Sequence, residues 1–400
     1  MTRALVSPFQ ELEDELGPGI LLRSEAELAV YSYDAALDRG RPDAVVVPRS
    51  AEQVQKTVAW CAKRKVPFVA RGAGTNLSGG CIPLRGGIVI ALARLDRVLQ
   101  VDLEKGFAVV EPGVVNLNLQ RELEKVGRFY APDPASFKVS TIGGNIAENA
   151  GGPRCFKYGV TTNHVLALEV VMPDGTLARF SIDDAGPELA SLLVGAEGTL
   201  GVVVKAWVKI LPLPREIRTI LGGFPSIEAA TECVAAIVAS GVVPRVLEAL
   251  DRTTVESVAA YSGADYPKTE AVLLIETDGD QAGPEQEKVE AACRAHGALE
   301  IRTAKDPAER ERLWEGRRGA YAAMARLAPN VMVEDGVVPR DKLPEIVRRI
   351  RAICAKHSIE SVGLLFHAGD GNIHPNIAYD ERDAEQTARV KRAGHEILQA

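Results

Sequence analysis

The sequence predicts an α+β protein of roughly two or three domains, and three observations support this. Short apolar segments rich in β-branched residues alternate with helices that keep their apolar residues on one face. Three polar, glycine-rich loops lie among the predicted strands of the first half of the chain. Beyond Pro212-Leu213-Pro214 the composition changes to alanine-rich helices between apolar strands, so we expect a domain boundary there.

Composition narrows the class of protein. The 400 residues are 46% hydrophobic and 25% charged, which is typical of a soluble globular chain with an ample core. The formal net charge of −7 argues against a nucleic-acid partner, because a surface that neutralises phosphates usually makes the balance basic. No segment approaches the ~18 apolar residues of a membrane-spanning helix, and residues 1–16 are too acidic for a signal peptide. We therefore expect a cytoplasmic protein.

The six cysteines are widely scattered and form no CxxC pair. This pattern indicates reduced thiols and neither a disulfide framework nor an iron-sulfur site. Most of them are expected to be small core residues. Cys81 and Cys155 lie beside glycine-rich stretches, where contact with a ligand is an alternative.

The elements follow from capping residues and hydrophobic pattern. Ser50, for example, precedes an acidic first turn and an apolar face formed by Val54, Val58 and Cys61, as expected where a helix begins. The other predicted helices are Phe9–Leu16, Ile227–Ser240, Gln286–His296, Leu343–His357 and Ala384–Gln399. The predicted strands are Val45–Val47, Val66–Ala70, Gly87–Leu92, Phe107–Val110, Val202–Leu211 and Ala271–Glu276.

The first glycine-rich loop, RGAGTNLSGG, runs from Arg71 to Gly80. Glycines permit positive φ and let successive backbone N–H groups converge on an anion, so a phosphate or pyrophosphate is the expected ligand. The loop is neither a Rossmann fingerprint nor a P-loop, because no helical pattern and no lysine follow it. A glycine-rich turn without a ligand is the alternative for this loop taken alone.

Two further glycine clusters follow, STIGGNIAENAGG at residues 140–152 and GAEGTLG at residues 195–201. The turn PDPAS precedes the first of them, and Lys157-Tyr158-Gly159 follows it. A single phosphate would need only one such loop. Three loops among strands therefore predict a long, extended ligand.

The segment around residues 363–377 contains a candidate metal site. Asp370-Gly371 is a strong two-residue hairpin signal, and a turn centred there makes His367 and His374 direct cross-strand partners on one face. Partners of this kind have Cβ atoms about 4.5 to 5.5 Å apart, which lets both rings reach one metal ion at roughly 2.0 to 2.1 Å. Asn376 is expected on the same face. The alternative is that both histidines are ordinary core or surface residues.

The motifs RGAGTNLSGG, PDPAS, STIGGNIAENAGG and GAEGTLGVV, in this order, resemble the PCMH-type FAD-binding domain of the vanillyl-alcohol-oxidase superfamily. Within it the chain is most similar to the D-type subunit of glycolate oxidase and to FAD-linked D-lactate and D-2-hydroxyglutarate dehydrogenases. The resemblance implies an N-terminal helical segment (1–41), a two-subdomain FAD-binding domain (42–213) and an α+β cap domain (214–400).

The resemblance also implies which residues bind FAD. The first loop is expected to take the pyrophosphate, and the second and third loops the ribose, adenine and flavin edges. Because the first loop contains no histidine, FAD is expected to be bound without a covalent bond. The expected FAD-binding residues are Pro48, Arg71, Gly72, Ala73, Gly74, Thr75, Asn76, Gly79, Gly80, Pro132, Asp133, Ser136, Thr141, Gly143, Gly144, Asn145, Asn149, Gly151, Gly152, Tyr158, Gly159, Glu197, Gly198 and Val202.

The segment HAGDGNIHPN is similar to the metal-binding motif of the 2-hydroxy-acid dehydrogenase branch. This implies His367 and His374 as ligands of a divalent ion, expected to be zinc, with His374 and Asn376 also in the catalytic site. Arg317, in a WxxR pattern, is expected to grip the substrate carboxylate. The Glu334-Asp335 pair either lies near the metal or has a capping or turn role.

The family's third metal ligand and expected base lie in a GEHG-type motif, which this sequence does not contain. This absence is interpreted as truncation of the chain, with a divergent member of the family as the alternative. Either reading puts the activity of this chain in doubt.

The expected function is FAD-dependent oxidation of glycolate or D-lactate by hydride transfer to flavin N5. Expected partners are an iron-sulfur subunit and a second FAD-domain subunit, with membrane contact only through them. The alternative is an electron-relay or assembly subunit that holds FAD without catalysis of its own. A metal hydrolase is disfavoured because it leaves three ordered loops unexplained.

Overall fold

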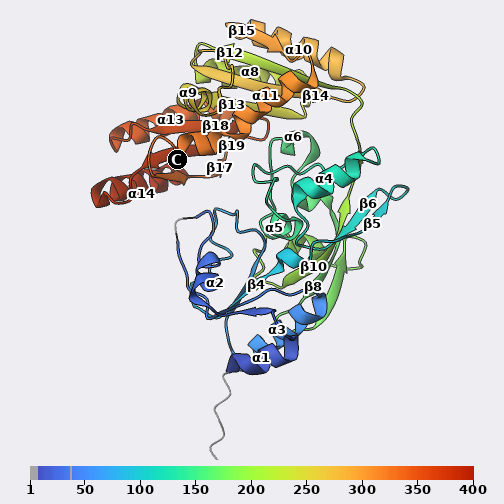
Figure 1. Cartoon of the computed structure of the whole chain (residues 1–400). Helices are drawn as coiled ribbons and strands as arrows, with labels where there is room; N and C mark the ends of the chain where they lie inside the picture. The colour runs from blue at the N-terminus through green and yellow to red at the C-terminus, as the bar shows by residue number, and fades with distance from the viewer. Residues whose placement is uncertain (1–7, 37) are drawn as a thin grey trace, which may run out of the picture. The chain divides into compact units, whose positions relative to one another are not determined.

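The computed structural model of the chain describes residues 8–36 and 38–400 (Figure 1). It forms two compact units. Unit 1 comprises the chain up to Gly152 together with Gly159–Leu213, and unit 2 comprises Pro153–Tyr158 together with Pro214–Ala400. The short segment 153–158 therefore belongs to unit 2, although its neighbours on both sides belong to unit 1.

The first subdomain of unit 1 is a four-stranded sheet of order β1-β2-β4-β3, in which β2, β4 and β3 are parallel. Its elements are α1 (Pro8–Leu16), β1 (Leu21–Leu22), α2 (Glu25–Val30), β2 (Ala44–Val46), α3 (Ala51–Arg64), β3 (Phe68–Arg71), β4 (Ile88–Ala91) and the 3-10 helix η1 (Leu92–Arg94). Helix α3 begins where the Ser50 side chain accepts a hydrogen bond from Gln53 N. Val54 and Val58 of α3 are fully buried in the core of this subdomain.

The second subdomain of unit 1 is an antiparallel five-stranded sheet of order β5-β6-β10-β8-β9. Strand β10 alternates buried and partly exposed residues, as expected for a sheet with one covered face. The elements are β5 (Val98–Asp102), β6 (Phe107–Val110), α4 (Asn116–Glu124), β7 (Arg128–Phe129), α5 (Ile142–Ala147), η2 (Thr161–His164), β8 (Val165–Val171), β9 (Leu177–Ser181), α7 (Leu189–Leu193), β10 (Val202–Lys209) and β11 (Leu211–Pro212).

Unit 2 is built on an eight-stranded antiparallel sheet of order β15-β12-β14-β13-β18-β19-β16, with β17 also paired to β19. Its strands are β12 (Ile217–Phe224), β13 (Val246–Asp251), β14 (Ala271–Asp278), β15 (Glu300–Thr303), β16 (Asn330–Val333), β17 (Gly336–Val337), β18 (Val362–His367) and β19 (Asn372–Tyr379). Its helices are α6 (Cys155–Tyr158), α8 (Ile227–Ala239), α9 (Arg252–Ser262), α10 (Ala282–Ala295), α11 (Pro307–Arg318), α12 (Ala320–Met324), η3 (Arg340–Lys342), α13 (Leu343–Lys356) and α14 (Ala384–Gln399).

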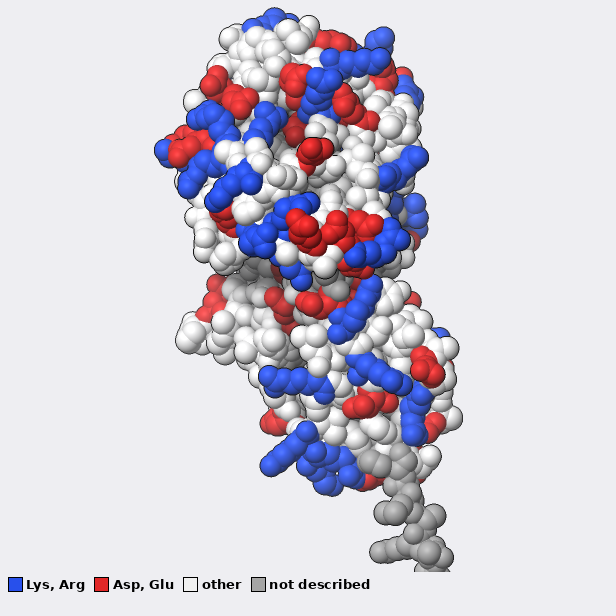
Figure 2. Space-filling model, turned by 90° about the vertical axis from the view of Figure 1, so that its left-hand side faces the viewer, with Lys and Arg blue, Asp and Glu red and all other residues white. Residues whose placement is uncertain are grey.

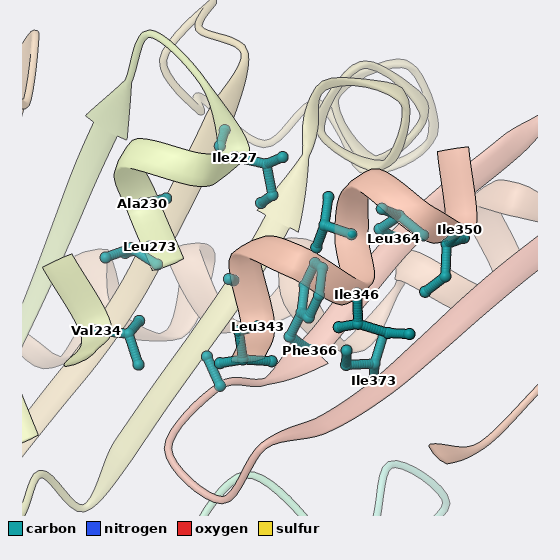
Figure 3. Packing of buried hydrophobic residues seen from close by; sticks show 14 of the residues in the cluster. Ile227, Ala230, Val234, Leu273, Leu343, Ile346, Ile350, Leu364, Phe366 and Ile373 are labelled. Atoms are coloured by element: carbon teal, nitrogen blue, oxygen red, sulfur yellow. The ribbon is translucent and has the colours of Figure 1, made fainter. Parts of the chain in front are cut away.

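The two faces of this sheet have separate cores. On one face, α8, α10, α13 and α14 share a large apolar cluster with alternate residues of β14, β18 and β19. Figure 3 shows part of this cluster, with Ile227, Ala230, Val234, Leu273, Leu343, Ile346, Ile350, Leu364, Phe366 and Ile373 labelled. On the other face, α9, α11 and α12 pack against apolar residues of β12, β13, β14 and β18. This second face carries the polar residues described below.

Segment 153–158 is held in unit 2 by three kinds of contact. Lys157 Nζ lies 2.5 Å from Asp278 Oδ1, and Tyr158 OH donates a hydrogen bond of 2.5 Å to Asp278 Oδ2. The guanidinium of Arg340 stacks 4.7 Å from the centre of the Phe156 ring. A Cβ added at Gly369 would lie 2.8 Å from Phe156, so this glycine permits the close approach.

Most predicted elements are present, and three of them differ from the prediction. The predicted helix Gln286–His296 begins four residues earlier, at Ala282. The predicted strand Val202–Leu211 ends at Lys209, and Leu211–Pro212 forms a separate strand paired with β7. The segment 1–41, predicted as helical, holds α1 and α2 but also β1, which pairs with β2. Residues 1–7 and 37 of that segment lie outside the described residues.

On the face shown in Figure 2, Lys and Arg side chains are interspersed with Asp and Glu side chains. All six cysteines are free thiols. In residues 8–36 and 38–400, no helix has both the length and the apolar character needed to cross a membrane.

Candidate functional site

The three glycine-rich loops come together in unit 1. A Cβ at Gly72 of the first loop would lie 2.5 Å from Thr141 Oγ1, where the second loop enters α5. A Cβ at Gly80 would collide with the Glu197 carboxylate of the third loop. These contacts are closer than real Cβ atoms allow, so a side chain at either position would force Thr141 or Glu197 to shift. Loops far apart in the sequence thus form one surface.

Hydrogen bonds fix the loops to one another. Gly195 N and Glu197 N donate to the carbonyls of Ile146 and Ala147, each at 2.9 Å. Ser78 Oγ of the first loop donates to Glu148 Oε2 of the second loop, also at 2.9 Å. These hydrogen bonds hold the three loops against one another.

Arg71 was predicted to contact the cofactor, and its side chain is buried beneath the loop that it begins. Its Nη1 donates to the Tyr33 carbonyl at 2.6 Å and lies 3.4 Å from Cys81 Sγ. Gly74, at φ +71°, leaves room for the guanidinium, which a Cβ at that position would meet. In this structure Arg71 supports the loop from below.

Two observations test whether unit 1 fits the expected dinucleotide. A cavity of about 320 Å³ is lined by Ala73 of the first loop and Thr141 of the second loop, together with residues of β5, α4 and the segments that precede them. Asn145 in α5 is 2% exposed, and its Nδ2 has no hydrogen-bond partner among the described residues. A buried amide without a partner is costly, so a ligand acceptor there would satisfy it. The residues present fit FAD.

All predicted FAD-binding residues lie in unit 1 except Tyr158, whose hydroxyl binds Asp278 in unit 2. Burial and the Asp278 carboxylate raise the pKa of Tyr158. The tyrosine is therefore a neutral hydrogen-bond donor at neutral pH.

The predicted histidine pair lies on the β18–β19 hairpin of unit 2, but the predicted register is wrong. His367 pairs with Asn372, and His374 pairs with Leu365, because residues 368–371 form a four-residue loop instead of a two-residue turn. Gly371 adopts φ +84° at the end of this loop. The two histidines are diagonal neighbours on one face and not direct partners.

Diagonal placement still brings the two imidazoles together. Their ring centroids are 5.0 Å apart and the ring planes are nearly perpendicular, at 86°. Burial and the positive charges of His367 and Arg317 lower the pKa of His374 to about 3. Burial also disfavours the charged form of His367, but the Glu248 carboxylate outweighs this and raises its pKa. His374 is therefore neutral near pH 7 and has a lone pair available for a ligand.

Glu248 was not predicted, and it is the centre of this cluster. It lies in the middle of β13, directly opposite His367 in the sheet, with no exposed surface. Its Oε1 is 2.7 Å from His367 Nδ1, and its Oε2 accepts a hydrogen bond of 2.7 Å from Arg317 Nε. Burial alone would raise the pKa of Glu248, but Arg317 and His367 hold it below its ordinary value. A single acidic residue within the apolar run of residues 246–250 is the sequence signal for it.

Arg317, the predicted carboxylate-binding residue, is 4% exposed and lies near the end of α11. Both Nε and Nη2 engage Glu248 Oε2. No hydrogen bond from Nη1 to another described residue accompanies them, so donors remain at one end of the guanidinium. The structure brings Arg317 and the histidine pair together through Glu248.

The other predicted residues surround His374. Asn376 is buried on the same face, and its Nδ2 donates to the His374 carbonyl at 2.8 Å. Asp335 Oδ1 lies 3.6 Å from His374 Nδ1. Glu334 lies instead against Gly394 of α14. Asp335, and not Glu334, is therefore the acidic residue nearest the histidines in this segment.

The described part of the chain holds no group of three or more His, Cys, Asp and Glu side chains arranged to bind a metal ion. The two histidines and their neighbours are nevertheless of the right chemical kind. Two imidazoles whose ring centroids lie 5.0 Å apart would fit a divalent ion whose remaining ligands come from water or substrate, and binding would require His367 in its neutral form.

Residues 42–181 match the family model described as FAD binding domain, and residues 213–400 match that of FAD linked oxidases, C-terminal domain. The chain therefore belongs to the FAD-linked oxidases of the vanillyl-alcohol-oxidase type, as its glycine-rich loops predict. The predicted fold class, a PCMH-type FAD-binding domain followed by an α+β domain, is confirmed.

Within this family, the chain is similar to glycolate oxidase subunits and to a D-lactate dehydrogenase. The chain is 41% identical over 398 residues to glycolate oxidase subunit GlcD of Bacillus subtilis, covering 98% of this chain and 84% of the relative. It is 39% identical over 390 residues to the protein of the same name from Escherichia coli K12, covering 96% and 78%. It is 31% identical over 366 residues to a D-lactate dehydrogenase of Anaerostipes hadrus, covering 87% and 74%.

Solved structures show the same fold at low sequence identity. An alkyldihydroxyacetonephosphate synthase aligns with a TM-score of 0.81 at 19% identity, covering 99% of this chain and 80% of that one. p-Cresol methylhydroxylase aligns with a TM-score of 0.81 at 17% identity, covering 98% and 86%.

Proposed function

We propose that this protein oxidises a small 2-hydroxy acid, glycolate or D-lactate, to the corresponding 2-oxo acid. The observation that carries the proposal is the buried cluster in which Glu248 joins Arg317 to His367, with His374 beside it. An arginine and a histidine pair are suited to a carboxylate and its neighbouring hydroxyl. Relatives named glycolate oxidase subunit and D-lactate dehydrogenase support the same substrate class.

Unit 1 provides the second part of the proposal. Its three joined loops, including Gly72, Gly80 and Asn145, would hold FAD without a covalent bond. Bound FAD supplies a hydride acceptor at flavin N5. Most of the predicted FAD-binding residues are small or polar and line these loops, and we retain them all except Tyr158 and Arg71 as direct contacts.

Unit 2 binds and orients the substrate in this proposal. The donors left at Arg317 Nη1 hold the substrate carboxylate, and Asn376 lies on the same sheet face for a second polar contact. The neutral His374 has the state needed of a metal ligand or of a group that accepts the hydroxyl proton. A divalent ion held by His367 and His374, expected to be zinc, supplies Lewis-acid chemistry at the hydroxyl.

The partners belong to the same proposal. The relatives named as glycolate oxidase subunits support assembly with other subunits. We propose an iron-sulfur subunit and a second FAD-domain subunit as electron acceptors, and a cytoplasmic location.

The electron-relay or assembly subunit remains the second candidate. The observation that favours it is that only two histidines, and no third protein ligand in the described chain, are arranged for a metal. A relay that holds FAD needs neither a substrate site nor a metal.

One experiment separates the two. The purified protein is titrated without oxygen with glycolate, D-lactate and D-2-hydroxyglutarate while the flavin absorbance is recorded. Bleaching by one of them is expected, because substrate oxidation leaves two electrons on the flavin. A flavin that stays oxidised with all three acids, yet is reduced by dithionite, would reject the enzyme and favour the relay.

A further inference from the structure

We propose that Glu248 is a positioning residue. It orients Arg317 and His367 together, so that the carboxylate and the hydroxyl of one substrate can be bound at the same time. This inference rests on the proposed function. Glu248 touches neither substrate nor cofactor in the proposal and acts only through its two partners.

The burial of Glu248 is the first step of the argument. A carboxylate with no exposed surface in the middle of a strand is costly unless its charge is paired and hydrogen-bonded. An apolar residue at this position would pack as Val246 and Leu250 do on the same face. The chain instead keeps a charge here, and both of its oxygens are engaged.

The division of the two oxygens is the second step. Oε2 takes Nε and Nη2 of Arg317, which fixes the plane of the guanidinium and leaves Nη1 at its outer end. A planar fork held from one side can bind a carboxylate at the other side with little further loss of side-chain entropy. Glu248 therefore sets the direction in which Arg317 offers its remaining donors.

The other oxygen sets the state of His367. An ionised carboxylate only accepts hydrogen bonds, so the ring nitrogen 2.7 Å from Oε1 must be the one that carries hydrogen. This makes Nδ1 the donor and presents Nε2 as the ligand atom. A carboxylate that fixes the tautomer and rotation of a ligating histidine commonly strengthens metal binding.

The experiment compares Zn²⁺ affinity and steady-state kinetics of the full-length wild-type protein, Glu248→Gln and Glu248→Asp. Glu248→Gln keeps the shape but cannot accept at both ends, so we expect Zn²⁺ binding about 10- to 100-fold weaker, with the FAD content unchanged. We also expect a raised KM from the unfixed Arg317 and a lowered kcat from the unfixed His367.

Glu248→Asp tests geometry against charge. Aspartate restores the negative charge but is one methylene shorter, so it cannot reach both partners. We expect it to fold at least as well as Glu248→Gln and still to bind Zn²⁺ more weakly than wild type. Wild-type affinity and kinetics in Glu248→Asp would show that Glu248 only neutralises Arg317, and would overturn the proposal.

Glu276→Gln is the matched control, because Glu276 is equally buried on the neighbouring strand and contacts α11 but no histidine. We expect lower stability with Zn²⁺ affinity close to wild type. An equal loss of Zn²⁺ affinity in this control would indicate general loosening of α11 and would overturn the positioning role. Zn²⁺ binding that is absent in the wild type, or unchanged in Glu248→Gln, would also overturn it.

The proposed function fails separately. If no hydroxy acid reduces the wild-type flavin, the substrate class is wrong, and the Zn²⁺ titrations of wild type and Glu248→Gln still decide whether Glu248 organises a metal site.

Discussion

Two buried glutamates on adjacent strands of one sheet have different partners. Glu248 on β13 and Glu276 on β14 both have no exposed surface and both bind residues of α11. Glu276 accepts from Arg310, Trp314 and Thr219, and Arg245 lies 3.5 Å away. Glu248 has one arginine and a histidine whose second ring nitrogen is left for a ligand. Burial alone therefore does not identify a functional carboxylate. The two glutamates differ in whether their partners still have atoms available to bind a ligand.

The same helix serves both carboxylates. Arg310, Trp314 and Arg317 are spaced by four and three residues, so they lie on one face of α11 above the sheet. The closed network around Glu276 anchors the helix at Arg310 and Trp314. The cluster around Glu248 can therefore rely on a fixed backbone at Arg317.

The largest effect is expected on the Glu248 side of the comparison. His374→Ala removes the neutral imidazole beside His367 and should abolish dye reduction by glycolate or D-lactate, with FAD still bound in unit 1. Steady-state assays and flavin absorbance measure both. His395→Ala, a substitution on the outer helix α14, is the control and should turn over normally. Unchanged turnover in His374→Ala would exclude His374 from the catalytic site.

On the Glu276 side, stability should change instead of catalysis. Glu276→Ala removes one buried counter-charge from Arg310 and Arg245, although Asp278 still lies 3.0 Å from Arg245. We expect a loss of about 3 to 5 kcal/mol in the free energy of unfolding of unit 2. Urea unfolding followed by tryptophan fluorescence measures this. A loss well below 1 kcal/mol would mean that the network around Glu276 is not structural.

Acid should act through the same residue. Burial alone would raise the pKa of Glu276, but the hydrogen bonds and charge of Arg310 and the charge of Arg245 lower it to about 2. A lowered pKa contributes stability above the unfolded value, and this is lost as pH falls from about 4.5 towards 2, by about 3 kcal/mol in all. Between pH 6 and pH 3, the free energy of unfolding should therefore decrease less steeply with falling pH for Glu276→Gln than for wild type. The same pH dependence of the free energy of unfolding in both proteins would contradict the lowered pKa of Glu276.

The smallest effect sharpens the comparison. Thr219→Val removes one donor, at 2.8 Å, from a carboxylate that keeps several others. We expect a loss of about 1 to 2 kcal/mol of stability, because a buried charged acceptor loses one of its bonds. Thermal unfolding measures it, with activity expected to be unchanged. A change in Zn²⁺ affinity in this variant would show that the hydrogen bonds around Glu276 influence the cluster around Glu248, contrary to our expectation.

Local signals predicted the fold well. Ser50 predicts where α3 begins because a cap acts on residues three positions away, and the apolar runs predict β6 and β14 because alternation and burial are written locally. The order of the glycine-rich loops predicted the family, which is confirmed. That the loops share a ligand stays a prediction. The loops meet at Gly72 and Gly80, where an added side chain would force Thr141 or Glu197 to shift.

The site was less predictable because it depends on register and on distant partners. A shift of the turn by one residue separates direct from diagonal pairing, so the Asp370-Gly371 signal placed His367 and His374 correctly on one face but not opposite each other. Glu248 lies 69 residues from Arg317 and 119 residues from His367 in the sequence. No local pattern records such contacts, and only the order of strands β13, β18 and β19 brings them together.

Segment Pro153–Tyr158 has a consequence for how this protein is made and divided. The ribosome completes Lys157 and Tyr158 more than a hundred residues before Asp278, so they must wait for β14 before their contacts can form. A fragment that begins at Pro214 would contain every strand of the unit 2 sheet but not these two donors. Of the three side chains that bind Asp278, namely Lys157, Tyr158 and Arg245, only Arg245 would remain. If the chain were divided into two expression fragments after residue 213, the second fragment would therefore lack contacts that belong to unit 2.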